Sequence, residues 1–170
     1  KDAAGVVTVS EPLRGVLAQR YSNETAVVWN GFDPDDFPLA EELSSGSREG
    51  PLVITYTGSL YGGRRNPGPV FEAIQEMGDD GKKVQLRFFV SGDCERVLRG
   101  LAQTHGVEDQ VQILGLVSFE QSMKEQCNSD VLLLLLGDSQ RSEGVFTSKV
   151  FEYLGARRPV LVVGGNENNV

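Results

Sequence analysis

The chain has 170 residues, of which 39% are hydrophobic and 24% are charged, so it can bury one sizeable core and is too apolar to be disordered. Its formal net charge of −8 at pH 7 argues against a general nucleic-acid-binding protein, which needs a basic face. The longest apolar run, Val131–Leu136, is far shorter than the about 20 residues of a membrane span. Two cysteines and one histidine are too few for a disulfide framework or a metal cluster.

The first 51 residues fall into two stretches of different composition. Two short apolar runs, at 6–9 and 26–29, flank a helical pattern. We expect residues 1–30 to be the end of an N-terminal domain or an interdomain segment, with Trp29 packed between this segment and the core. Residues 31–51 are first acidic and then rich in Ser and Gly, which predicts a linker.

From residue 52 onward, strand-like and helix-like patterns alternate. Short apolar runs predict five strands, at Leu52–Thr57, Val84–Val90, Val111–Leu114, Val131–Leu136 and Pro159–Val163. The intervening segments have helical spacing and predict helices at 67–77, at 94–104, from 118 onward and at 147–154.

Capping residues support these boundaries. Asn66 is a candidate N-cap, with Pro67 in the first helical turn, and Gly106 is a candidate stop for the second helix. Ser118, with Gln121 three residues later, matches a capping box.

The order βαβαβαβαβ, with strands too uniformly apolar to have a solvated face, predicts the fold class. Such strands belong to a parallel sheet covered by helices on both sides. We therefore predict a Rossmann-like, doubly wound α/β domain over residues 52–170, with ligands bound beyond the carboxyl ends of the strands. Because the sequence stops just after a strand, we expect this domain to be truncated at its C-terminus.

The first candidate site is the glycine-rich turn Gly58–Asn66, which leads from a strand into a helix. Between Leu52 and Phe71 there are two arginines and no acidic residue. Backbone amides, the helix dipole and guanidinium groups all favour an anion such as a diphosphate. The turn is neither G-x-G-x-x-G nor a P-loop, so the alternative is an ordinary loop with solvated arginines.

The second candidate site is the segment 143–153, in which Thr147 or Ser148 caps a new helix. Lys149 lies in the first turn, where a cation is unfavourable for the helix dipole unless an anionic ligand is present. Glu152, three residues later, could accept hydrogen bonds from vicinal hydroxyls such as those of a ribose. The alternative is a surface Lys–Glu pair.

These segments resemble group-one retaining glycosyltransferases. Thr147–Leu154, followed by Arg158–Leu161, is similar to the family's Lys-x-x-Glu signature helix and the strand after it. Further resemblance, covering most of the chain in the family's order, lies in segments 7–10, 29–37, 56–65, 89–92 and 111–117.

The resemblance implies a GT-B fold, in which two Rossmann-like domains face each other across a cleft, and it identifies this chain with the C-terminal, donor-binding domain. It implies that a diphosphate is held by Arg64 and Arg65, by the backbone at Gly58 and Ser59, and by the helix start at Thr147, Ser148 and Lys149. It also implies that ribose and base are bound by Glu152, Gly92, Leu116 and Val117.

The catalytic candidates that the resemblance implies are Glu143, Lys149 and Arg65. Glu143 stands one position away from the first Glu of the family's E-x7-E motif, and a bulge would bring it to the donor sugar. We expect no metal and no cofactor, because Arg, Lys and the helix dipole can carry the charge of the leaving diphosphate.

The expected activity is that of a hexosyl-type glycosyltransferase using a UDP-, GDP- or other nucleotide-sugar. The acceptor domain is expected in the same protein but outside this sequence, so the fragment alone is expected to be inactive. We expect a cytoplasmic protein that touches a membrane surface only through that domain. A GT-B-like sugar-nucleotide epimerase and a non-catalytic nucleotide-binding module are alternatives, whereas a dinucleotide oxidoreductase lacks its G-x-G-x-x-G motif.

Overall fold

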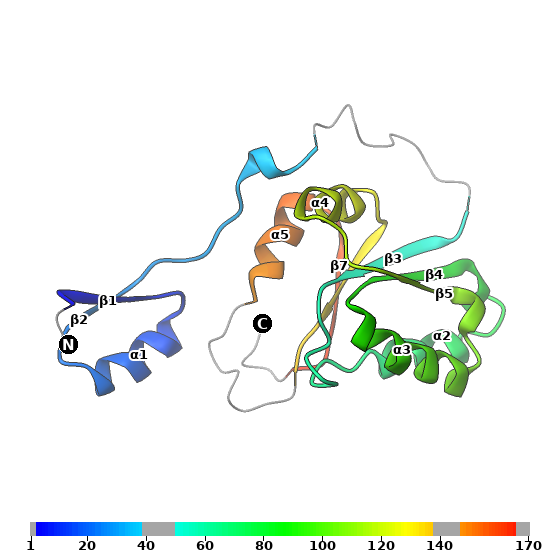
Figure 1. Ribbon diagram of the computed structural model, residues 1–170, viewed down its shortest axis with the longest axis horizontal. Coiled ribbons are helices and arrows are strands. Elements are labelled where there is room, and N and C mark those ends of the chain that lie inside the picture. Colours follow the sequence, from blue (N-terminus) through cyan, green and yellow to red (C-terminus); the bar gives the residue numbers. More distant parts are fainter. Residues whose placement is uncertain (1–2, 39–49, 138–146, 166–170) are drawn as a thin grey trace.

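A computed structural model describes residues 3–38, 50–137 and 147–165. Its centre is a sheet of five parallel strands in the order β5-β4-β3-β6-β7 (Figure 1). These strands are β3 (Leu52–Thr57), β4 (Val84–Phe89), β5 (Val111–Leu114), β6 (Val131–Leu135) and β7 (Val160–Val163). The predicted parallel, doubly wound sheet is confirmed.

Helices cover both faces of this sheet (Figure 1). They are α2 (Gly68–Glu76) and α3 (Gly92–His105) on one face, and α4 (Phe119–Cys127) and α5 (Ser148–Ala156) on the other. Alternate residues of β6 enter the two cores. Leu133 and Leu135 pack in the cluster that includes Phe71 and Leu98, whereas Leu132 and Leu134 pack with Tyr153. Burial on both faces explains why the strand sequences are uniformly apolar.

The direction of winding changes between β3 and β6. The chain moves outward from β3 through β4 to β5, then crosses back to β6 and β7. In open parallel sheets of this kind, ligands bind in the crevice at the carboxyl ends of the two strands where the order reverses. The topology therefore predicts a ligand site at the residues that follow β3 and β6.

The helix ends agree in part with the predicted caps. Gly106 ends α3 in the left-handed conformation (φ 65°), and the Ser118 side chain accepts a hydrogen bond from the Gln121 N–H, as predicted. The Gln121 side chain, however, donates to Glu125. Pro67, not Asn66, is the N-cap of α2, while the Asn66 Oδ1 atom accepts a hydrogen bond from the Gly68 N–H.

Residues before the linker form a small unit apart from the large sheet (Figure 1). It consists of β1 (Gly5–Thr8), α1 (Glu11–Arg20) and β2 (Glu24–Val27), and the two strands pair in parallel. No residue of α1 is buried, and Val7 is 66% exposed. Trp29 is 58% exposed, so the prediction that it packs against the core was wrong.

The segment after β2, of which the structure describes residues 28–38, is called the connecting segment, and two of its phenylalanines contact α5. Phe32 and Phe37 contact each other edge to face, with 5.6 Å between ring centroids, on either side of the short 3-10 helix Pro34–Asp36. Both rings lie against Gly155, where a Cβ atom would overlap the Phe37 ring and lie 2.9 Å from Phe32. Of the predicted linker 31–51, residues 39–49 lie outside the described residues. Within the described part of the chain, no helix is long and apolar enough to cross a membrane.

Candidate functional site

The carboxyl end of β3 is where the two sequence motifs meet. Gly58 directly follows β3 and has a φ of 121°, which favours glycine. A Cβ atom there would lie 2.6 Å from Cε and 2.8 Å from Nζ of Lys149, a residue 91 positions later in the first turn of α5. The glycine thus leaves the space that the lysine side chain occupies.

Lys149 is a half-buried cation that has few polar neighbours among the residues that the structure describes. Its Nζ atom donates to the Thr57 hydroxyl at 3.3 Å and lies 6.0 Å from the centre of the Tyr56 ring. Burial lowers the pKa of Lys149, with a further lowering from Arg65, while Glu152 acts in the opposite direction. A desolvated ammonium group of this kind gains more from an anionic ligand than a solvated one does.

The two arginines of the glycine-rich turn are held differently. The Arg65 guanidinium stacks 4.5 Å from the centre of the Tyr61 ring, and its Nη1 atom donates to the Tyr56 hydroxyl at 3.4 Å. Burial raises the pKa of Tyr56, and the hydrogen bond from Arg65 opposes this. Arg64 is exposed, and its carbonyl oxygen lies close to Gly137, directly after β6. The turn therefore bridges the ends of β3 and β6, with Arg65 anchored at its base.

Ser59 shapes this turn through two hydrogen bonds. Its carbonyl accepts a hydrogen bond from the Tyr56 hydroxyl at 2.7 Å, and its Oγ atom accepts one from the Tyr61 N–H at 3.1 Å. Tyr61 has a φ of 51°, uncommon for a residue with a side chain.

The start of α5 lies beside Lys149. Thr147, and not Ser148, is the N-cap, and its side chain makes no capping hydrogen bond. Ser148 is exposed in the first turn. The first N–H groups of a helix have no partner within the helix, so this end can accept an anion.

Glu152 is half-buried one turn further along α5. Its Oε2 atom accepts a hydrogen bond at 3.3 Å from the amide of Gln126, a fully buried residue of α4 that the sequence did not single out. Among the described residues, no ion pair joins Lys149 to Glu152. The alternative of a surface Lys–Glu pair therefore does not describe this site.

Three further predicted residues, Gly92, Leu116 and Val117, lie along the same edge of the sheet. Gly92 is the first residue of α3, after β4, and is exposed. Leu116 and Val117 follow β5 and are 69% and 37% exposed. Glu143 lies outside the described residues.

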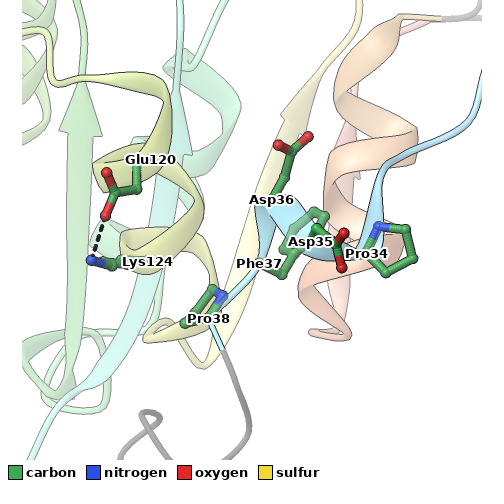
Figure 2. A pocket seen from close by; sticks show the side chains of 7 residues that line it. All are labelled: Pro34, Asp35, Asp36, Phe37, Pro38, Glu120 and Lys124. Atoms are coloured by element: carbon green, nitrogen blue, oxygen red, sulfur yellow. Dashed lines mark hydrogen bonds and ion pairs between the residues drawn. The ribbon is translucent and has the colours of Figure 1, made fainter.

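A cavity of about 400 Å³ lies elsewhere, between the connecting segment and α4 (Figure 2). Among the described residues that line it, three are carboxylates, Asp35, Asp36 and Glu120, and one is a cation, Lys124, which is paired with Glu120 at 2.7 Å. This lining disfavours a phosphate. No group of three or more His, Cys, Asp or Glu side chains that could hold a metal is present within 3–38, 50–137 and 147–165.

Comparisons with known proteins bear on the fold. No family model matches the sequence, and no curated protein matches it either. WaaG, a glycosyltransferase involved in lipopolysaccharide biosynthesis, superposes with a TM-score of 0.69 and 17% identity over 92% of this chain and 43% of its own. Sucrose-phosphate synthase from Thermosynechococcus elongatus superposes with a TM-score of 0.70 and 18% identity, over 95% of this chain and 41% of its own. Anabaena HepE in complex with UDP-glucose superposes with a TM-score of 0.68 and 17% identity, over 94% of this chain and 44% of its own.

These similarities establish the fold and the share of each neighbour's length that this chain spans. The neighbours are GT-B glycosyltransferases, and the chain has the Rossmann-like fold of one half of such proteins, as predicted. It spans less than half the length of each of these three structures.

Proposed function

We propose that this chain is the donor-binding part of a nucleotide-sugar-dependent retaining glycosyltransferase of hexosyl type. One observation carries the proposal: Lys149 lies over Gly58, close to Arg65, at the point where the strand order reverses. The HepE neighbour, solved with UDP-glucose, supports a nucleotide-sugar as the class of donor.

In the proposed mechanism, the positive groups of the site stabilise the leaving nucleoside diphosphate. Negative charge develops on the diphosphate as the sugar–oxygen bond breaks, and groups that are already oriented toward it lower the barrier most. Arg65 and Lys149 are held by hydrogen bonds to Tyr56 and Thr57, and the N–H groups at the start of α5 add to their effect. Because these groups supply the charge, the proposal needs no metal and no cofactor. Glu143 is proposed to act at the donor sugar.

The nucleoside is proposed to extend from the diphosphate along the edge of the sheet. Glu152 would accept hydrogen bonds from the two ribose hydroxyls, since a carboxylate is an acceptor with two oxygens. Gly92 leaves open space, and Leu116 and Val117 present apolar surface to a base.

The acceptor is proposed to bind to a separate domain of the same protein. A two-stranded sheet such as β1–β2 is marginal alone, and Val7 and Val16 of this unit are 66% and 60% exposed. We propose that residues 1–30 complete that domain, that residues 31–51 link it to the donor-binding residues 52–170, and that the chain alone binds donor with little or no turnover. A cytoplasmic location, with membrane contact only through that domain, belongs to the same proposal.

Calorimetric titration of the chain with UDP, GDP, ADP and NAD, each with and without magnesium, tests this function. We expect saturable binding of one nucleoside diphosphate without magnesium. Lys149→Ala, Arg65→Ala and Glu152→Ala should each weaken it about tenfold or more. Arg99→Ala is the control, because this arginine is exposed on α3 and pairs with Glu95.

Two outcomes would contradict the proposal. Tighter binding of NAD would indicate a dehydrogenase. Equal affinities for the three site variants and the control would show that nucleotides bind elsewhere.

A further inference from the structure

A buried amide lies beneath the proposed site. Gln126 in α4 has no exposed surface. Its Nε2 atom lies within hydrogen-bond distance of three oxygens: 3.2 Å from Thr57 Oγ1, 3.3 Å from Ser122 Oγ and 3.3 Å from Glu152 Oε2. An amide nitrogen has two protons, so three acceptors share two donors. Its Oε1 atom is buried without a partner in the described part of the chain, which is unfavourable for stability.

The charge of Glu152 determines which way this amide points. With the amide reversed, Oε1 would face the carboxylate and two acceptors would repel each other. The observed orientation instead directs the positive end of the amide dipole at Glu152 Oε2. Gln126 therefore donates to the Glu152 side chain without carrying a charge itself.

The amide also connects Glu152 to Lys149 through one hydroxyl. Thr57 Oγ1 accepts from both Gln126 Nε2 and Lys149 Nζ, at 3.2 and 3.3 Å. Lys149 and Glu152 are three residues apart on α5, a spacing at which opposite charges commonly pair. No ion pair joins them among the residues described, and each charge is held by a neutral partner instead.

We propose that Gln126 is a positioning residue, whose amide keeps Glu152 apart from Lys149 so that the carboxylate is presented to a vicinal diol while the ammonium is presented to an anion. The inference rests on the proposed function, since the diol is the ribose of the donor. It assigns to α4 a part in nucleotide binding, although Gln126 is too deeply buried to touch the ligand.

The test compares two nucleotides on two variants. UDP, GDP and ADP are titrated into the unsubstituted chain, and the tightest of them is used together with its 2′,3′-dideoxy form. Gln126→Met keeps the length of the side chain and removes the N–H donors. We expect it to bind the ribose nucleotide about tenfold more weakly and the dideoxy nucleotide with unchanged affinity. Gln121→Met is the matched control, since this glutamine is exposed on the same helix.

The outcomes separate this inference from the proposed function. If Gln126→Met weakens both nucleotides equally, or neither, Gln126 does not act through the ribose contact and the inference is wrong. If the unsubstituted chain binds no nucleoside diphosphate, the proposed function fails, and the inference fails with it.

A second variant guards against a folding defect in Gln126→Met. In Gln126→Glu, the new carboxyl faces Glu152 of α5, the Ser122 hydroxyl of α4 and the Thr57 hydroxyl of β3. Lys149 also donates to this Thr57 hydroxyl, and the Tyr153 phenol, whose pKa burial raises, lies next to it. When protonated, it can donate to Glu152 as the amide does. We expect its affinity for the ribose nucleotide, relative to the unsubstituted chain, to fall as pH rises, because the introduced carboxyl loses the proton that it donates. If the ratio of the affinity of Gln126→Glu to that of the unsubstituted chain does not change with pH, the inference is overturned.

Discussion

Replacing Gly58 by alanine should separate the stability of the site from its ability to bind a nucleotide. The added Cβ atom would lie 2.6 Å from Lys149 Cε, whereas carbon atoms in contact are about 3.5–4.0 Å apart. The lysine side chain must therefore move by roughly 1 Å, which takes it away from the Thr57 hydroxyl. Because this is the end of a flexible side chain, the movement itself costs little folding free energy.

The backbone supplies the stability effect. At a φ of 121°, a residue with a Cβ is strained by about 1–3 kcal/mol. For a chain of this size, 2 kcal/mol corresponds to a decrease in Tm of roughly 4–8 °C. Displacement of the ammonium group would remove the charge-assisted hydrogen bond to phosphate that the proposed function assigns to Lys149, so we expect binding about 10- to 100-fold weaker.

The control is Gly62→Ala in the same turn. Gly62 has a φ of 64°, and no heavy atom of the described residues lies within 4 Å of its added Cβ. The Gly62→Ala variant should be less stable by about 1–2 kcal/mol, because the alanine must adopt the left-handed backbone conformation. Thermal unfolding by circular dichroism and calorimetric titration with UDP measure the two effects. If Gly58→Ala and Gly62→Ala bind UDP equally well, the contact with Lys149 does not matter for binding, and the reasoning is refuted.

Three further substitutions, the last of them with a matched control, test other features of the structure. Lys149→Met should raise the Tm at pH 7, because burial lowers the pKa of Lys149 and the folded chain is therefore destabilised by this charge. The gain should shrink as pH rises toward the unfolded value of 10.5, and a gain independent of pH would contradict this reasoning. Tyr153→Phe removes a 3.0 Å hydrogen bond to a buried carbonyl of β6 and should lower the free energy of unfolding in urea by about 1–2 kcal/mol; an unchanged midpoint would argue against it. Gly155→Ala should lower the Tm because its Cβ overlaps the Phe37 ring, whereas Gly100→Ala, on an open helix surface, should raise stability by up to about 1 kcal/mol. Equal Tm changes would show that Phe37 does not hold the segment on α5.

The sheet was predictable because its sequence signals are local. Each strand is a short apolar run, and the run Val131–Leu136 lacks polar positions because β6 is covered on both faces. The site motifs were predictable in part for a related reason, since the turn after β3 and the start of α5 both follow strands. Parallel strands place such segments at one edge.

Gln126 was not predictable, because its partners are distant in the sequence. Its hydrogen bonds reach Thr57, 69 residues away, and Glu152, 26 residues away. The one available signal was its position on α4, where Met123 and Cys127 mark the buried face and Gln126 falls on that face. A polar residue on the apolar face of a helix indicates a buried contact but does not identify the partner. Trp29 shows the opposite failure, since its apolar character favours burial and it is nevertheless 58% exposed.

The small unit β1–α1–β2 has a consequence for amide hydrogen exchange. Among the described residues, its two strands pair only with each other, α1 buries none of its residues, and Thr8 is one of the few buried residues there. Such a unit opens locally at a small free-energy difference, so its amide protons should exchange with solvent almost as fast as those of an unstructured peptide. The amides of β3, which has a strand on each side and a helix on each face, exchange only when the whole sheet unfolds. In solution, one chain should thus show two exchange regimes, a fast one for β1–α1–β2 and a slow one for the five-stranded sheet.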